Sequence, residues 1–77
     1  MTTETISDKR NRLERGIQAA VEIRGIWRGT TCPTGEYYGW DVGEHYALEQ
    51  IQRNPPKGLH VSRIFKFECY DWTVVAQ

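Results

Sequence analysis

The sequence lacks several features that would identify a class of function. Its 10 basic and 10 acidic side chains leave no net charge, whereas proteins that bind nucleic acid regardless of sequence normally carry a basic excess. No apolar run approaches the roughly 20 residues needed to span a bilayer. The polar residues 1–8 contain no apolar signal-peptide core, so we expect a cytoplasmic protein and no membrane partner.

Cysteine is scarce as well. The two cysteines do not make a disulfide framework, and in the cytoplasm we expect free thiols rather than a Cys32–Cys69 disulfide, the less favoured alternative. A metal site from Cys32, His45, His60 and Cys69 would lack the local ligand pairs that build most structural zinc sites. No nucleophile motif and no glycine-rich phosphate loop is present. We therefore expect no enzymatic activity, no metal and no cofactor.

Aromatic residues are plentiful by contrast, at 12% of the chain. Disordered chains lack such residues, so the chain should fold. Its 77 residues fit one small domain, 1–77, in which residues 1–7 are expected to fray.

The first half of the chain predicts a short helix and a long strand. A helix is expected over Lys9–Arg15, capped by Ser7 or Asp8 and ended by Gly16. Apolar and polar residues then alternate over 17–28, which favours a strand over a helix continuing to residue 21. Residues 29–35 are typical of a loop because they contain glycine and proline.

The second half predicts one helix between strands. Asp41 and Glu44 form a capping-box pattern at the start of a helix over Val42–Arg53, and the following prolines end it. Strands are expected over 36–40, 59–67 and 72–76, with a weak turn at 70–71. The expected fold is α+β: a short N-terminal helix followed by β-β-α-β-β, with a four-stranded, mainly antiparallel sheet and one helix packed on one face.

Charge is distributed unevenly along the neutral chain. Residues 1–28 carry six basic and four acidic side chains, and residues 53–77 carry four basic and two acidic ones. Residues 29–52 carry four acidic side chains and no lysine or arginine. An acidic, aromatic block therefore lies between basic flanks, and such a surface suits a basic partner.

This block leads to our main hypothesis, a small non-enzymatic binding protein that acts by protein–protein contact. It would occlude a basic, nucleic-acid-handling surface of a host protein. Small inhibitors from phages and mobile elements, anti-CRISPR proteins among them, have this size and style, which is an analogy only. The expected partner-binding residues are aromatic or acidic: Glu36, Tyr37, Tyr38, Trp40, Asp41, Glu44, Tyr46 and Glu49.

The alternative is a small nucleic-acid-binding module that uses the open face of the sheet. In the expected first strand, Arg24 and Arg28 share one face, which permits a basic stripe. A homodimer through sheet faces or edges is compatible with either hypothesis. The residues of the alternative site are basic: Arg10, Arg12, Arg24, Arg28, Arg63 and Lys66.

Overall fold

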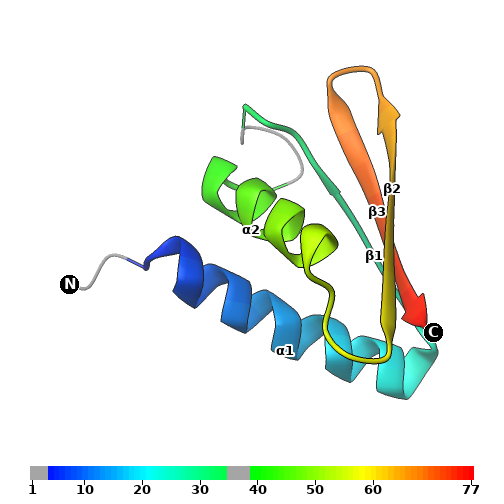
Figure 1. Cartoon of the computed structure of the whole chain (residues 1–77). Coiled ribbons are helices and arrows are strands. Elements are labelled where there is room, and N and C mark those ends of the chain that lie inside the picture. Colours follow the sequence, from blue (N-terminus) through cyan, green and yellow to red (C-terminus); the bar gives the residue numbers. More distant parts are fainter. Residues whose placement is uncertain (1–3, 35–38) are drawn as a thin grey trace.

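The computed structural model describes residues 4–34 and 39–77. Its elements are α1 (Ile6–Arg24), β1 (Ile26–Thr31), α2 (Val42–Arg53), β2 (Leu59–Lys66) and β3 (Cys69–Ala76). The strands form one antiparallel sheet in the order β1-β3-β2, and both helices lie on one side of it (Figure 1). The expected four-stranded β-β-α-β-β fold with one packed helix is therefore wrong; the order is α-β-α-β-β with three strands and two helices.

Helix α1 is much longer than expected because its end signals lie elsewhere. Thr5 is the N-cap, and it forms a capping box with Asp8 in which each side chain accepts a hydrogen bond from the other residue's backbone N–H. The helix ends at Gly25, whose φ of 82° is a left-handed conformation that glycine adopts without steric penalty. Gly16 lies inside the helix and does not end it.

The long strand expected from residue 17 is the main error in local structure. Ile17 and Val21 fit an alternating pattern, but they are also four residues apart and so share one helix face. Both are buried, together with Leu13 one turn earlier. Ala19 and Ile23, which alternation would place beside them, are exposed. Only the end of the expected strand is extended, as β1.

Of the strand expected over 36–40, the structure describes only the last two residues. Residues 36–38 lie outside the described residues, and Gly39 and Trp40 are not in a strand. Strand β1 instead occupies residues that were expected to be partly loop. Gly29 in β1 leaves room for an aromatic ring, because a Cβ at this position would lie 2.7 Å from the Trp27 side chain.

The second half of the chain follows its prediction closely. Helix α2 has the expected bounds, and the capping box of Asp41 and Glu44 is present. Strand β2 ends one residue early, at Lys66, and β3 begins at Cys69. The turn therefore lies at residues 67–68 and not at 70–71.

The core lies between the helices and one face of the sheet. Alternate residues of β2 and β3 point toward the helices, and Leu59, Val61, Trp72 and Val74 among them are buried. In the described residues no helix covers the opposite face, called the open face below (Figure 1). Leu13, Ile17 and Val21 of α1 and Ala47, Leu48 and Ile51 of α2 pack in the core with Leu59, Val61, Trp72 and Val74. From the register, the open face carries Ile26, Arg28, Thr30, His60, Ser62, Ile64, Lys66, Cys69, Asp71, Thr73 and Val75.

Candidate functional site

The acidic residues at the start of α2 are paired with basic residues of α1. Asp41 accepts a hydrogen bond from Lys9 at 2.8 Å, and Glu44 lies 3.6 Å from the Arg12 guanidinium. The hydrogen bond from Lys9 holds the pKa of Asp41 below its ordinary value, and it raises the pKa of Lys9 in turn. The two helices thus lie side by side in the same direction (Figure 1), and the charges of the two N-terminal ends are largely compensated.

Glycine at position 43 makes room for this contact. A Cβ there would lie 3.0 Å from the Lys9 Nζ and 3.2 Å from the Asp41 Oδ1. The ammonium group of Lys9 therefore passes over Gly43 to reach Asp41. A larger residue would displace it.

The third acidic candidate, Glu49, is also occupied. One carboxylate oxygen lies 3.2 Å from Arg63 on β2, and the other lies 3.4 Å from the His45 ring. Every acidic candidate in the described residues therefore has a basic partner within the chain. The candidates Glu36, Tyr37 and Tyr38 lie outside the described residues.

The two remaining aromatic candidates differ in exposure. Trp40 is half-buried against the core, and its ring meets the Trp27 ring edge to face at 6.1 Å. Tyr46 is 48% exposed on α2. Trp40 therefore packs against the core, and Tyr46 remains available for contact with another molecule.

The basic candidates are dispersed over the molecule. Arg10 pairs with Glu14, and Arg12 pairs with Glu4 as well as with α2. The expected stripe through residues 24 and 28 is absent, because residue 24 ends α1 while residue 28 lies in β1. On the open face, Arg28 and Lys66 occupy the two outer strands, with Asp71 on the central strand.

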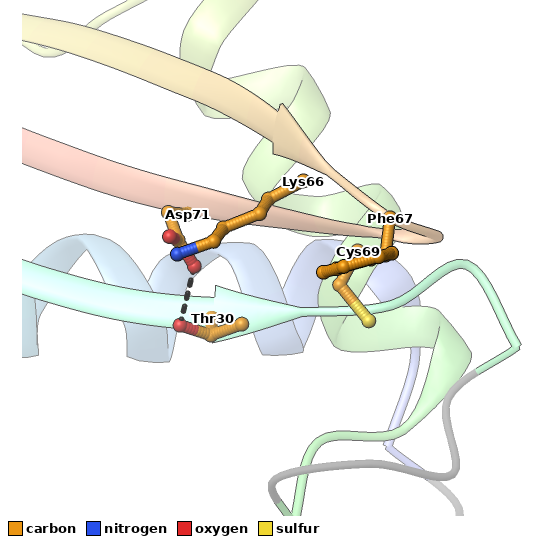
Figure 2. A pocket seen from close by; sticks show the side chains of 5 residues that line it. All are labelled: Thr30, Lys66, Phe67, Cys69 and Asp71. Carbon is orange, nitrogen blue, oxygen red and sulfur yellow. Dashed lines mark hydrogen bonds between the residues drawn. The ribbon is translucent and has the colours of Figure 1, made fainter.

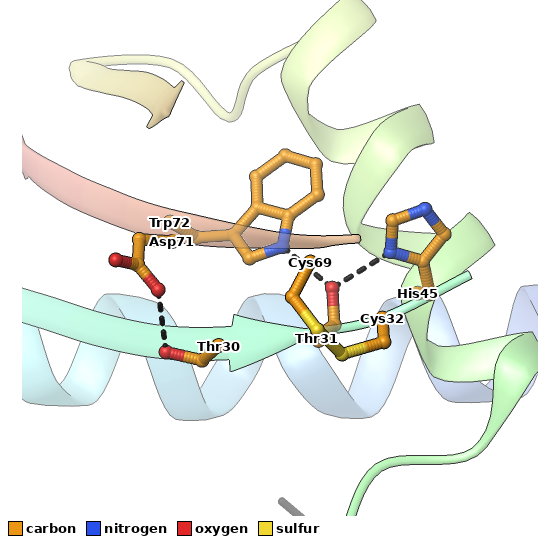
Figure 3. The surroundings of a disulfide bond; sticks show 7 residues. All are labelled: Thr30, Thr31, Cys32, His45, Cys69, Asp71 and Trp72. Atoms are coloured by element: carbon orange, nitrogen blue, oxygen red, sulfur yellow. Dashed lines mark hydrogen bonds between the residues drawn. A yellow bond between two sulfur atoms is a disulfide. The ribbon is translucent and has the colours of Figure 1, made fainter. Parts of the chain in front are cut away.

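A buried polar network links the helices to the sheet, and sequence reasoning missed it. The Trp72 Nε1–H donates to the Thr31 hydroxyl at 2.7 Å, and that hydroxyl lies 2.7 Å from the His45 Nδ1 (Figure 3). Since Thr31 accepts from Trp72, we assign its own proton to the bond with Nδ1, which leaves Nε2–H facing Glu49.

This network stabilises the fold. His45 and Thr31 are fully buried, so neither can meet a substrate. Burial lowers the pKa of His45; Glu49 opposes this effect and Arg63 adds to it. The neutral ring satisfies every polar atom of the network, and a charged ring would not.

The two cysteines form a disulfide bond, so the expectation of free thiols is wrong. Cys32 and Cys69 are the next cross-strand pair after Thr31 and Tyr70, which end the β1–β3 ladder. The bond therefore fixes the end of β1 to β3, beside the buried network (Figure 3). The sequence alone could not place the cysteines opposite each other, because the strand pairing was unknown.

Three large apolar side chains are exposed on the β2–β3 hairpin. These residues, called the hairpin patch below, are Ile64, Phe65 and Phe67, which are 70%, 62% and 86% exposed. Phe65 lies against Tyr70, with ring centroids 5.1 Å apart, and the Arg63 guanidinium lies 4.8 Å from the same Tyr70 ring. One sequence signal was available: three apolar residues over 64–67 occupy both alternating sides of a strand, so one helix layer cannot bury them all.

Phe67 holds an unusual backbone conformation at the tip of this hairpin. Its φ is 59°, and it is the one non-glycine residue in the described chain with a positive φ. Glycine is favoured at such a position. A large aromatic residue that is both strained and exposed is a feature that folding alone does not require.

A small hollow of about 270 Å³ lies beside the tip, on the open face. Thr30, Lys66, Phe67, Cys69 and Asp71 line it, and Thr30 donates a hydrogen bond to Asp71 at 2.8 Å within it (Figure 2). Over residues 4–34 and 39–77, no three histidine, cysteine, aspartate or glutamate residues are grouped so that they could hold a metal ion.

Comparisons with known proteins give no relative. No protein-family model matches the chain, and no curated protein or solved structure matches it. The function must therefore be argued from the surface of this molecule alone.

Proposed function

We propose that this protein is a small non-enzymatic binding protein that acts through protein–protein contact at the hairpin patch. The observation that carries the proposal is the exposure of Ile64, Phe65 and Phe67 on one hairpin. Ile64 lies on the open face and Phe65 on the helix side, so the exposed apolar surface extends around the edge and the tip of the hairpin. Apolar surface left exposed in this way is typical of interaction sites. Aromatic residues next to an arginine, here Arg63, are also the residues that dominate binding energy at interfaces.

The mechanism that we propose is occlusion: the protein covers a surface that its partner needs. A stoichiometric inhibitor of the phage or mobile-element kind would act in this way, and the small size of the chain supports that origin. A basic partner is a further part of the proposal. Glu68 follows Phe67 in the turn and Asp71 pairs with Ile64 in the β2–β3 register; both support it, whereas the acidic residues of α2 contribute less because they are already paired.

The test is capture of a partner by the purified protein, compared between two matched variants. Phe67→Ala removes the most exposed aromatic side chain of the patch, and Ile23→Ala removes an apolar side chain of similar exposure, 80%, at the end of α1. We expect Phe67→Ala to lose the partner while Ile23→Ala retains it. Equal retention by both variants, with unchanged circular dichroism, would contradict the proposed site.

The charge of the partner is tested separately, by measuring binding against salt concentration. A basic partner facing Glu68 and Asp71 should bind faster at low salt, because screening weakens long-range attraction. Binding that does not change with salt would argue for a purely apolar contact.

The nucleic-acid alternative rests on Arg28 and Lys66 of the open face, which no helix covers. Asp71 lies between the strands that carry them, which opposes the approach of phosphate. A titration with DNA and with RNA at low salt decides the matter. Binding that weakens steeply with salt supports the alternative, and no binding removes it.

The compartment is a separate proposal. No helix in the described part of the chain is long and apolar enough to cross a membrane. The sequence favours the cytoplasm, where thiols are kept reduced, whereas the Cys32–Cys69 bond favours an oxidising compartment. Trapping thiols by alkylation in intact cells separates the two: a chain that takes up two alkyl groups there is cytoplasmic and reduced.

A further inference from the structure

Strand β2 has an unpaired edge. In residues 4–34 and 39–77, β2 pairs with β3 alone and forms an outer strand of the three-stranded sheet. An unpaired edge presents backbone N–H and C=O groups to any strand that can align with it. The β2–β3 register runs without interruption from residue 59 to residue 66, so no bulge protects this edge.

The charged side chains of β2 do not protect the edge either. Arg63 is directed to the helix side, where it pairs with Glu49 and lies over Tyr70. Lys66 lines the hollow of the open face (Figure 2). Two of the exposed side chains along the end of β2, Ile64 and Phe65, are apolar.

We propose that this edge binds the β2 edge of a second copy of the chain, in antiparallel alignment centred on Ile64. The proposal rests on the proposed function, because it names a second copy of the chain as the protein that binds part of the hairpin patch. The pairing would join two three-stranded sheets into one six-stranded sheet, a common size. Phe67 lies beyond the end of β2, so it lies outside the paired residues 62–66.

The alignment follows from the alternation of side chains. Two copies related by a twofold axis perpendicular to the sheet keep their helices on the same side, so residues that face each other must come from the same face of β2. Centring on Ile64 places it against its own equivalent and places Arg63 opposite Phe65. The chain already packs Arg63 on an aromatic ring, at 4.8 Å from Tyr70, so this pairing repeats a contact it can make.

Neighbouring alignments are less favourable. Centring on Arg63 brings two guanidinium groups face to face, and like charges directly opposite are destabilising. Centring on Ser62 separates the two Ile64 side chains and pairs each with an exposed histidine, His60. The absence of net charge on the chain removes the general repulsion that two identical charged molecules would feel.

The first test is the mass of the purified protein in solution, measured by analytical ultracentrifugation over a wide range of concentration. We expect the 9.0 kDa chain to sediment with twice its own mass. Ile64→Lys should restore the single mass, because it places two ammonium groups on the twofold axis. Ile23→Lys, at a similarly exposed site on α1 and outside the sheet, should leave the dimer intact.

The second test is the alignment, measured by cross-linking without reductant. The native cysteines are bonded to each other, so a single introduced cysteine is the only free thiol. Ile64→Cys should give a covalent dimer, because opposite residues of neighbouring strands are close enough for a disulfide. Ser62→Cys, one position away on the same face, should give far less.

Three results would overturn the inference. A wild-type chain that remains a monomer at every concentration is the first, and a dimer that survives Ile64→Lys is the second. The third is cross-linking through Ser62→Cys in preference to Ile64→Cys. A monomer whose Phe67→Ala variant still loses a captured partner would overturn the second copy and leave the proposed function standing.

Discussion

Reduction of the Cys32–Cys69 bond is the perturbation whose effect the structure predicts most directly. The two cysteines are 37 residues apart in the chain and join β1 to β3. Both strands also contribute to the core and to the buried network. Reduction removes the covalent link without removing any of those contacts, so its effect falls mainly on the unfolded chain.

The size of the effect follows from the length of the closed loop. Closing a loop of 37 residues restricts the unfolded chain by about 4 kcal/mol at room temperature. A domain of this size has a total stability of roughly 4–12 kcal/mol. With an unfolding entropy of about 2 cal/mol/K per residue, the loss corresponds to a fall in Tm of about 25 °C. Reduction should therefore remove a third or more of the stability.

The assay is thermal unfolding followed by circular dichroism, with and without a phosphine reductant. The control is Cys32→Ala/Cys69→Ala, whose Tm should lie near that of the reduced wild type and should not respond to the reductant. A reduced wild-type protein that melts within a few degrees of the oxidised one would refute the argument. So would free thiols in protein that was purified without reductant.

Three further predictions concern the buried network and the hairpin. Thr31→Val leaves Trp72 Nε1 and His45 Nδ1 without their hydrogen-bond partner, so it should lower the free energy of unfolding by about 2–4 kcal/mol, measured by denaturant titration. Thr31→Ser keeps the hydroxyl and should lower that free energy by less in the same titration. Because burial lowers the pKa of His45, the unfolded chain takes up a proton on this residue before the folded chain does as pH falls. The free energy of unfolding should therefore decrease below about pH 6.5 and level off once His45 is also protonated in the folded protein. This pH dependence should persist in His60→Gln and disappear in His45→Gln. Phe67→Gly should relieve the positive φ and raise stability by about 1 kcal/mol while it weakens partner binding; a variant that is less stable would contradict the strain at this residue.

Helix α2 was predictable because all of its signals lie within residues 41–56. Asp41 and Glu44 mark its start, and the prolines after Asn54 mark its end. Helix α1 has equally local signals in Thr5, Asp8 and Gly25. The alternation over residues 17–28 nevertheless favours a strand there, because the spacing of Ile17 and Val21 fits one face of a strand and one face of a helix equally well.

The surface could not be predicted in the same way, because it depends on pairing between distant segments. The disulfide needs β1 to pair with β3, and the His45 network needs α2 to lie over both strands. The exposure of the hairpin patch depends on how many helices cover the sheet and on which side. The disulfide and the network are not local, so composition and spacing contain no record of them; for the hairpin patch, the apolar residues on both sides of 64–67 were the one local sign.

The distribution of charge illustrates the same limit and changes the argument about function. Counted along the sequence, residues 29–52 are an acidic block between basic flanks. In the fold, Lys9 and Arg12 come from the first flank and Arg63 from the second, and they meet Asp41, Glu44 and Glu49 of that block. The ion pairs between these oppositely charged segments therefore hold α1 against α2 and α2 against β2. The surface that is left for a partner includes the exposed apolar side chains, which take no part in these ion pairs. In the described residues, the hairpin patch is the part of this apolar surface that lies at an unpaired strand edge.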